Sequence, residues 1–225
     1  MKRRGFCGLL LVLATATSQR AVVRASNGVS DSFGALAPAF VANPDSESEA
    51  SLISVGGGRP IFFTRHDVRI VDPPAARSLW LSFVGTDEPV ISGDHPTGGR
   101  VAFVRRPATI VRPAYHEVVY RGLWTGIDAR ITGEGGGLEY AFEIAAGANP
   151  GAIRLRYLGV DRMRLEANGD LALAADGQTI VDRAPIAYQL VRGRRQSVPV
   201  RFALRESKVT FEVGDYDRAR PLVID

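Results

Sequence analysis

The sequence has a single cysteine, Cys7, which lies in an apolar stretch near the start of the chain. We expect that stretch to be removed, so the mature protein should contain no cysteine, and disulfide bonds and thiol catalysis are excluded. Cys7 follows Arg4, Gly5 and Phe6 rather than a small-residue lipobox after a full apolar segment. That context argues against a lipid anchor at this position.

Long apolar runs are also lacking, because none reaches the roughly 20 residues that span a bilayer. The chain starts with Lys2, Arg3 and Arg4, and an apolar run follows from Gly5 to about Thr17. This pattern predicts a secretory signal peptide over residues 1–25. Cleavage after Ala14-Thr15-Ala16 and cleavage after Val23-Arg24-Ala25 both stay open.

Arg3-Arg4 also resembles the core of a twin-arginine signal. The residues around it fit that signal poorly, so ordinary secretion is the favoured route. By either route we expect a secreted protein, located outside the cell or in the cell envelope.

The mature chain lacks an excess of positive charge, although the whole sequence has a pI of about 9.6. Residues 1–25 hold five of the 28 basic residues and no acidic one, which leaves 23 basic residues against 24 acidic ones. Binding to a phosphate backbone depends on a positive field. We therefore expect no nucleic-acid partner.

Helical periodicity is absent over any stretch of ten or more residues, although residues 147–153 could hold one short turn beside Pro150. Apolar residues instead alternate with polar ones, which is typical of half-buried antiparallel strands. The alternation covers residues 79–83, 138–144, 153–157, 200–204 and 209–213.

Turn-forming segments separate these runs: GEGGG at 133–137, ANGD at 167–170, the segment from Ala174 to Gln178, and RGRR at 192–195. Asn-Gly and Asp-Gly supply the positive φ angles that two-residue hairpins need. Many short strands with such turns predict an all-β fold, an antiparallel β-sandwich-like domain.

We expect this domain to cover residues 52–225, as one unit or as two packed β subdomains. Residues 26–51 are rich in Ser, Ala, Pro and Asp, with Phe40-Val41 as one apolar anchor. Such a composition predicts a flexible N-terminal segment after the signal peptide.

The three histidines, His66, His95 and His116, lie far apart in the sequence, and none has a second ligand residue at metal spacing. His66-Asp67 and His116-Glu117 are adjacent pairs, and neighbouring side chains on a strand point to opposite faces. We expect these histidines to lie on the surface or in turns, with no metal and no cofactor.

Asp128 and Glu139 are the best candidates for acid–base catalysis, because a hairpin through the turn at 133–137 could bring their strands together. Two carboxylates in different environments are what glycoside hydrolysis requires. Glu139 nevertheless alternates with Tyr140 and should face water, so we assign no catalytic residue.

Other catalytic and binding motifs are missing or incomplete. No G-x-S-x-G elbow and no phosphate loop occur, and Gly56-Gly57-Gly58 lies between expected strands. Asp215 and Asp217 could approach a calcium ion, but the further oxygen ligands of a known loop are missing. We interpret residues 214–217 as a turn that ends a strand.

Several segments carry a family resemblance: FVAN at 40–43, YRGLWTGIDARI at 120–131, the segment 138–173, APIAYQ at 184–189 and the segment 209–225. Through them the chain resembles the uncharacterised N-terminal all-β domain, DUF7948-like, that precedes SBBP-type β-propeller repeats in exported bacterial proteins. The resemblance implies export and an all-β fold, and it implies no catalytic residue.

The chain departs from that pattern at Leu123-Trp124-Thr125, at Ala141 and across residues 99–113. It also stops at Asp225, where relatives usually continue into propeller repeats, which would fit a stand-alone form or a truncated gene. We expect Leu222, Val223 and Ile224 to dock as the final strand, beside residues 209–213 or as a crossing edge strand.

The expected function is that of an exported, non-enzymatic structural, adhesive or binding module. Its partner would be another envelope or extracellular protein or a glycan. The alternative is a carbohydrate-active or other hydrolytic domain that uses Asp128 and Glu139.

Overall fold

The computed structural model describes residues 38–45, 47–72, 77–105, 107–134 and 137–225. The predicted signal peptide, Cys7 and residues 26–37 lie outside these ranges. Within them the chain forms strands and a single three-residue 3₁₀ turn, so the predicted all-β class is confirmed. No helix in the described part is long and apolar enough to cross a membrane.

The strands follow one another along the chain with short connections. They are β1 (Ala39–Ala42), β2 (Leu52–Val55), β3 (Ile61–Phe63), β4 (Asp67–Asp72), β5 (Arg77–Phe83), β6 (Val90–Arg105), β7 (Ala108–Trp124), β8 (Ile127–Glu134), β9 (Gly137–Ile144), β10 (Leu155–Leu158), β11 (Arg162–Leu165), β12 (Leu171–Ala175), β13 (Gln178–Asp182), β14 (Ala187–Val191), β15 (Arg194–Val198), β16 (Val200–Arg205), β17 (Lys208–Val213) and β18 (Leu222–Ile224), with the 3₁₀ turn η1 at Pro150–Ala152.

The turn-formers end strands as the sequence predicts. In the β12–β13 hairpin, Asp176 and Gly177 have φ angles of 52° and 73°. Arg192 and Gly193 adopt the same left-handed conformation between β14 and β15. Two successive positive φ angles match the twist of the flanking strands, which is why such dipeptides fix the hairpin register.

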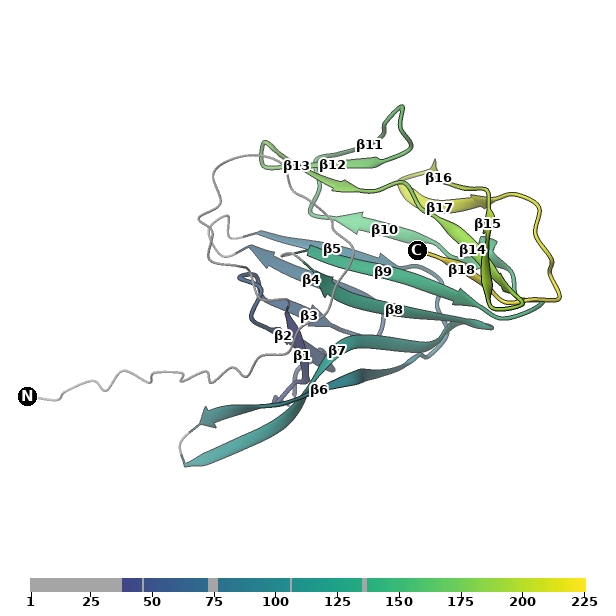
Figure 1. Ribbon diagram of the computed structural model, residues 1–225. Coiled ribbons are helices and arrows are strands. Elements are labelled where there is room, and N and C mark those ends of the chain that lie inside the picture. The colour runs from purple at the N-terminus through teal and green to yellow at the C-terminus, as the bar shows by residue number, and fades with distance from the viewer. Residues whose placement is uncertain (1–37, 46, 73–76, 106, 135–136) are drawn as a thin grey trace, which may run out of the picture.

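Fifteen strands form one sheet, whose main path runs β15-β14-β18-β9-β8-β7-β1-β2-β3-β4-β5-β10-β17-β16, with β6 added beside β7. The two ends of this path are joined through Pro199, because β15 ends at Val198 and β16 starts at Val200. The sheet therefore folds back on itself into two layers around one core (Figure 1).

Aromatic contacts across the core show this folding directly. Phe142 of β9 packs on Phe211 of β17 with ring centroids 5.7 Å apart, and Tyr120 of β7 packs on Phe83 of β5 at 5.3 Å. Neither pair consists of neighbouring strands. Edge-on aromatic pairs of this kind contribute about 0.5–1.5 kcal/mol beyond the area that they bury.

A separate three-stranded sheet, β11-β12-β13, covers one end of the core. Leu171 and Leu173 of β12 are buried in it. Asp182, at the end of β13, accepts hydrogen bonds from Tyr140 and Tyr157 at 2.6 and 2.5 Å. This carboxyl group therefore links the small sheet to β9 and β10 of the large one.

The distal half of the β6–β7 hairpin, residues 99–113, extends away from the body; we call it the ribbon (Figure 1). A register shift between Pro96 and Arg100 separates it from the proximal half. Val101 and Phe103 pack on Val41, Ile53 and Val55 in a small cluster apart from the main core. The ribbon is thus fixed along one side to β1 and β2.

Two expectations about the ends of the chain are right only in part. Residues 39–42 are not part of a flexible segment: they form β1, which pairs with β2 and β7 and buries Phe40 and Val41 completely. The final strand β18 does dock, but between β9 and β14 rather than beside residues 209–213 or as an edge strand. In both cases a short apolar segment completes a layer formed by strands distant in sequence.

Candidate functional site

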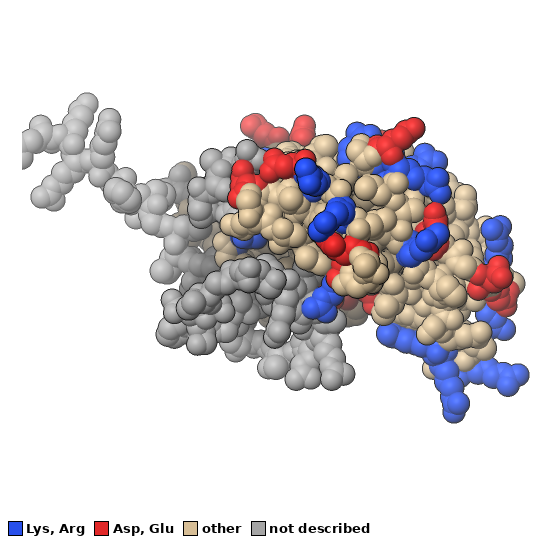
Figure 2. Space-filling view, turned by 90° about the horizontal axis from the view of Figure 1, so that it is seen from above, with Lys and Arg blue, Asp and Glu red and all other residues tan. Residues whose placement is uncertain are grey.

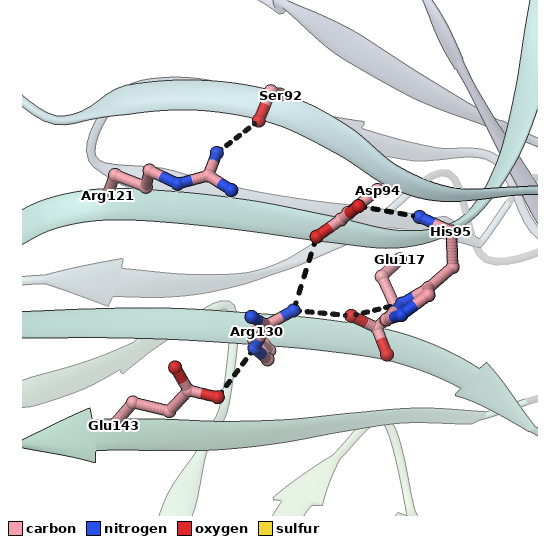
Figure 3. A network of polar contacts seen from close by, with 7 residues as sticks. All are labelled: Ser92, Asp94, His95, Glu117, Arg121, Arg130 and Glu143. Carbon is pink, nitrogen blue, oxygen red and sulfur yellow. Dashed lines mark hydrogen bonds and ion pairs between the residues drawn. The ribbon is translucent and has the colours of Figure 1, made fainter. Parts of the chain in front are cut away.

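The densest cluster of ionisable side chains lies on the outer face of the layer formed by β6, β7, β8 and β9 (Figure 3). Inward positions on these strands, such as Tyr120, Ile131 and Phe142, are buried in the core. The alternation of strand side chains therefore directs Glu117, Arg130 and Glu143 outward. The β6–β7 pairing places Asp94 directly opposite Glu117.

Arg130 is the centre of the cluster. Its Nη1 donates to Glu117 Oε2 at 2.9 Å and lies 3.4 Å from Asp94 Oδ2, and its Nε donates to Glu143 Oε1 at 2.6 Å. His95 Nδ1 lies 3.2 Å from the same Glu117 oxygen. One guanidinium thus joins side chains from four neighbouring strands.

The stem of Arg130 has a second role, because Val119 is its direct partner across the β7–β8 ladder. Val119 lies on the outer face of the layer and is only 1% exposed. Long charged side chains commonly cover apolar surface with their stems while the charged end stays near water. As the cross-strand partner of Val119, Arg130 is placed to cover part of this apolar position with its stem.

The electrostatics fit a cluster in which one cation is shared by three carboxylates. Burial lowers the pKa of Arg130, but the hydrogen bonds and charges of Glu143 and Glu117 outweigh it, so the net pKa is raised. The pKa of Asp94 is lowered, first by the backbone N–H of His95 and also by Arg130. Both shifts favour the charged forms, as expected for paired groups.

Asp94, His95 and Glu117 each offer a ligand atom within 4.8 Å of the others, the spacing of a metal site. Arg130 Nη1, however, already contacts the carboxylates of both Asp94 and Glu117. A divalent cation would have to displace a cation that is part of the fold. The arrangement is better suited to cross-linking four strands than to holding a metal.

The sequence did not reveal this cluster, because its members come from four strands separated along the chain. His95 does meet a second ligand-type residue, Glu117, through the β6–β7 register and its own left-handed φ of 51°. One feature of the sequence could have pointed to the cluster: the turn-like segment GDHPTGG at 93–99, which lies at the register shift of β6.

Asp128 and Glu139 do not come together as a pair. Asp128 is opposite Glu143, whereas Glu139 is opposite Thr132, four residues further along β8. At about 3.3 Å per residue this is a separation of roughly 13 Å along the strand. Asp128 Oδ1 accepts a hydrogen bond from the Gly122 backbone N–H at 2.8 Å, which joins β8 to β7 at the register shift between Tyr120 and Trp124.

Two of the remaining candidate residues, His66 and Asp217, have local structural contacts. His66 Nδ1 lies 2.7 Å from Thr86 Oγ1, and His116 is exposed on β7. Asp217 uses one carboxylate oxygen for the Ala219 N–H and the other for Arg220. The strand β17 ends at Val213, as predicted, but residues 214–217 are not themselves a turn: the turn starts at Asp217, whose C=O accepts from the Arg220 N–H.

A groove of about 330 Å³ lies beside the ribbon. We call it the ribbon groove; its lining includes Asn43 and Asp45 at the rim and Ile53, Phe62, Phe103 and Val104 along its apolar part. Sequence reasoning missed it, because the groove exists only where the ribbon folds over β2 and β3. The departure of residues 99–113 from the family pattern was the one sequence signal at this position.

Replacing Arg130 by alanine should lower the free energy of unfolding by about 1–3 kcal/mol, because three carboxylates lose their shared cation and Val119 loses its cover. Arg121→Ala is the matched control: its exposed guanidinium donates to the neutral Ser92 Oγ on the same face (Figure 3). The control should change stability by less than about 0.5 kcal/mol. Equal effects of the two substitutions in urea unfolding would contradict the role of Arg130.

Comparison with known proteins identifies a family for this chain. The sequence model of a family described as a domain of unknown function, DUF7948, matches residues 62–225. No curated protein and no solved structure matches the chain. The matched region starts within β3 and includes the Arg130 cluster, the ribbon and β18.

Proposed function

The chain belongs to the DUF7948 family of domains of unknown function, and from that premise we propose that it is an exported, non-enzymatic binding module. Its partner is another component of the envelope or the extracellular space, and its role is structural or adhesive. The signal-peptide pattern of residues 1–25 and the resemblance to domains that precede SBBP-type β-propeller repeats support export.

One observation carries the binding role: the ribbon extends from the body with apolar side chains exposed beside a groove. Val104 is 38% exposed and Val111 40%, and Val104 also lines the ribbon groove. Apolar side chains gathered at a concave site favour a binding surface over a plain solvated strand.

The carboxylates that could do chemistry have structural contacts instead. Arg130 forms ion pairs with Asp94, Glu117 and Glu143, and Asp128 accepts from the backbone of β7. The backbone positions of Asp128 and Glu139 are also separated by roughly 13 Å along the strand, which is unfavourable for the roughly 5–10 Å between the carboxyl groups of glycosidases. These observations favour a binding module over the hydrolytic alternative.

The charge distribution fits a protein or glycan partner better than a nucleic acid. On the face shown in Figure 2, basic and acidic side chains are interspersed over the described part of the molecule. A nucleic-acid surface would instead need a continuous basic patch that neutralises phosphates.

Cell fractionation tests the proposal. Cells expressing the tagged full-length chain should yield a shortened product outside the cytoplasm that sediments with the envelope. Val104→Asp should be shortened equally but shift to the soluble fraction, because it places a charge in the ribbon groove. Val90→Asp, at a 65% exposed position of β6 outside the groove, is the control and should sediment like the parent.

Two results would refute parts of this proposal separately. A full-length product confined to the cytosol would end the export claim. Sedimentation that is unaffected by Val104→Asp would end the assignment of the binding surface to the ribbon.

A further inference from the structure

We propose that the free edge of β6 in the ribbon binds an extended acidic peptide segment of a partner protein as an added β-strand. This inference rests on the proposed function and specifies the class of partner. It combines three features of this site: an unpaired edge of the ribbon, a groove along that edge, and the exposed arginine Arg100 beside it.

The unpaired edge is that of β6. In the part of the chain that the structure describes, β6 pairs only with β7, through an unbroken ladder from Arg100↔Pro113 to Arg105↔Ala108. A regular ladder on one side leaves alternate N–H and C=O groups pointing outward on the other. Those groups are what a strand from another chain binds in β-augmentation.

The other edge of the ribbon is less suitable. Pro113 of β7 has no backbone N–H to donate, and just beyond it β1 pairs with Ala114 and Tyr115. Residues 99–105 of β6 contain no proline. Since proline blocks a ladder where it occurs, the β6 edge offers the longer continuous run of donors and acceptors.

The ribbon groove follows this same edge. Phe103 and Val104 both line it, although neighbouring residues of a strand point to opposite faces. No residue of β7 is among its lining. A groove that reaches both faces of β6 and avoids β7 lies along the outer edge of β6, where alternate side chains of an added strand could enter it above Ile53 and Phe62.

The charge of the ribbon selects the partner. Residues 99–113 contain four arginines and no acidic residue, whereas the groove itself is lined by the acidic side chain of Asp45. Arg100, on β6, is exposed on the same face as Val104, whereas Arg112 is the partner of Val101 and therefore lies on the opposite face. Charged residues on an edge discourage pairing between two copies of the same strand. Arg100 attracts acidic side chains that lie on its own face of an added strand.

The occupant is therefore an amphipathic strand, with apolar side chains toward the groove and acidic ones beside Arg100. A suitable probe is a fluorescent nonapeptide in which valine and glutamate alternate. Binding to the purified full chain is measured by fluorescence anisotropy. Replacing every glutamate by lysine should weaken binding at least tenfold, and Arg100→Glu or Val104→Asp should do the same, whereas Val90→Asp should not.

Backbone methylation tests strand addition itself. Two further peptides carry N-methyl groups on all valines or on all glutamates, so that each blocks a different edge of the strand. Only one edge faces β6, so one peptide should lose binding at least tenfold and the other should keep it. If both bind like the parent, or if the lysine peptide binds equally well, strand addition is wrong.

The two proposals can fail separately. If the acidic peptide does not bind while envelope sedimentation still depends on Val104, the ribbon is a binding surface and the partner class is wrong. If sedimentation is also unaffected by Val104→Asp, both the surface and the partner class are wrong.

Discussion

Deleting residues 221–225 is expected to abolish cooperative folding, the largest effect of any change considered for this protein. These residues include β18, whose Leu222 and Ile224 are 0% and 1% exposed. Burying each of these side chains stabilises the fold by about 1.5–3 kcal/mol. The deletion removes both, out of a typical total margin of about 5–15 kcal/mol.

The position of β18 adds to this loss. It pairs with β9 through Leu222, Val223 and Ile224 and with β14 on its other side. The backbones of Asp225 and Ile186 exchange two further hydrogen bonds, of 2.7 and 2.8 Å. Without β18 the sheet is cut between β9 and β14, and two strand edges that are now paired become open to aggregation.

Thermal unfolding followed by circular dichroism, together with the yield of soluble protein, measures the effect. Leu222→Ala should cost about 2–5 kcal/mol as a buried large-to-small change. Val223→Thr is the matched control, since Val223 lies between the two buried positions and is only partly buried. A truncated chain that melts within a few degrees of the parent would show that β18 does not support the sheet.

Strands and hairpins that show a local pattern could be predicted from the sequence, whereas the position of β18 in the sheet could not. Alternation over residues 138–144 and 209–213 identifies β9 and β17 and the face that each turns to the core. Asp176-Gly177 identifies the hairpin between β12 and β13. These features depend on local conformation and on one buried face, which a few residues are enough to encode.

The order of the strands is not local information. Leu222, Val223 and Ile224 alternate between buried and partly exposed positions like any strand, and nothing in them specifies β9 and β14 as neighbours. The same is true of Phe40 and Val41, which complete a layer between β2 and β7. Neighbours of this kind are selected by the packing of the whole core rather than by the strand itself.

The candidate site was hidden for a related reason. Asp94, Glu117, Arg130 and Glu143 meet because of three strand registers in succession. Each residue taken alone is an ordinary polar residue on the outer side of a strand. The ribbon groove depends in addition on how a hairpin folds over strands that precede it in the chain, which no residue pattern within the hairpin encodes.

Asp182 is the position where a single substitution should reveal the most about the core. Alternation predicts that it faces inward with Ile180, and it lies opposite the buried Leu171. Its carboxylate accepts hydrogen bonds from the hydroxyl groups of Tyr140 and Tyr157, which lie 3.4 Å from each other. Burial raises the pKa of both tyrosines, and the negative charge of Asp182 raises it further, so both stay protonated donors.

Asp182→Ala should lower the free energy of unfolding by about 1–3 kcal/mol, because at least one buried hydroxyl loses its acceptor. The two hydroxyls can bond to each other, but only one of them can then donate. Adding Tyr140→Phe and Tyr157→Phe to Asp182→Ala should recover part of this loss, since no unsatisfied polar group is left. If the triple variant is less stable by the sum of the single losses, the hydroxyl contacts do not explain the effect.

Asp182→Asn tests the charge separately through the pH dependence of unfolding. Burial raises the pKa of Asp182, the tyrosine hydroxyl groups partly oppose this, and the nearby charge of Asp170 raises it further, so the net pKa is above that of an ordinary aspartate. A folded-state pKa above the unfolded value means that the native state holds the proton more tightly. This contribution to stability is complete below the ordinary aspartate pKa and is lost as the pH rises through the raised one.

The asparagine variant keeps an oxygen that can accept from both tyrosines and carries no titrating charge. Its stability relative to the parent should therefore increase as the pH rises above the ordinary aspartate range, and level off once Asp182 is ionised in the folded protein. Urea unfolding of both proteins across this pH range measures the difference. A stability difference that stays constant with pH, or one that moves in favour of the parent, would mean that the folded protein does not disfavour the ionised carboxylate, and that the tyrosine hydrogen bonds outweigh the cost of its burial.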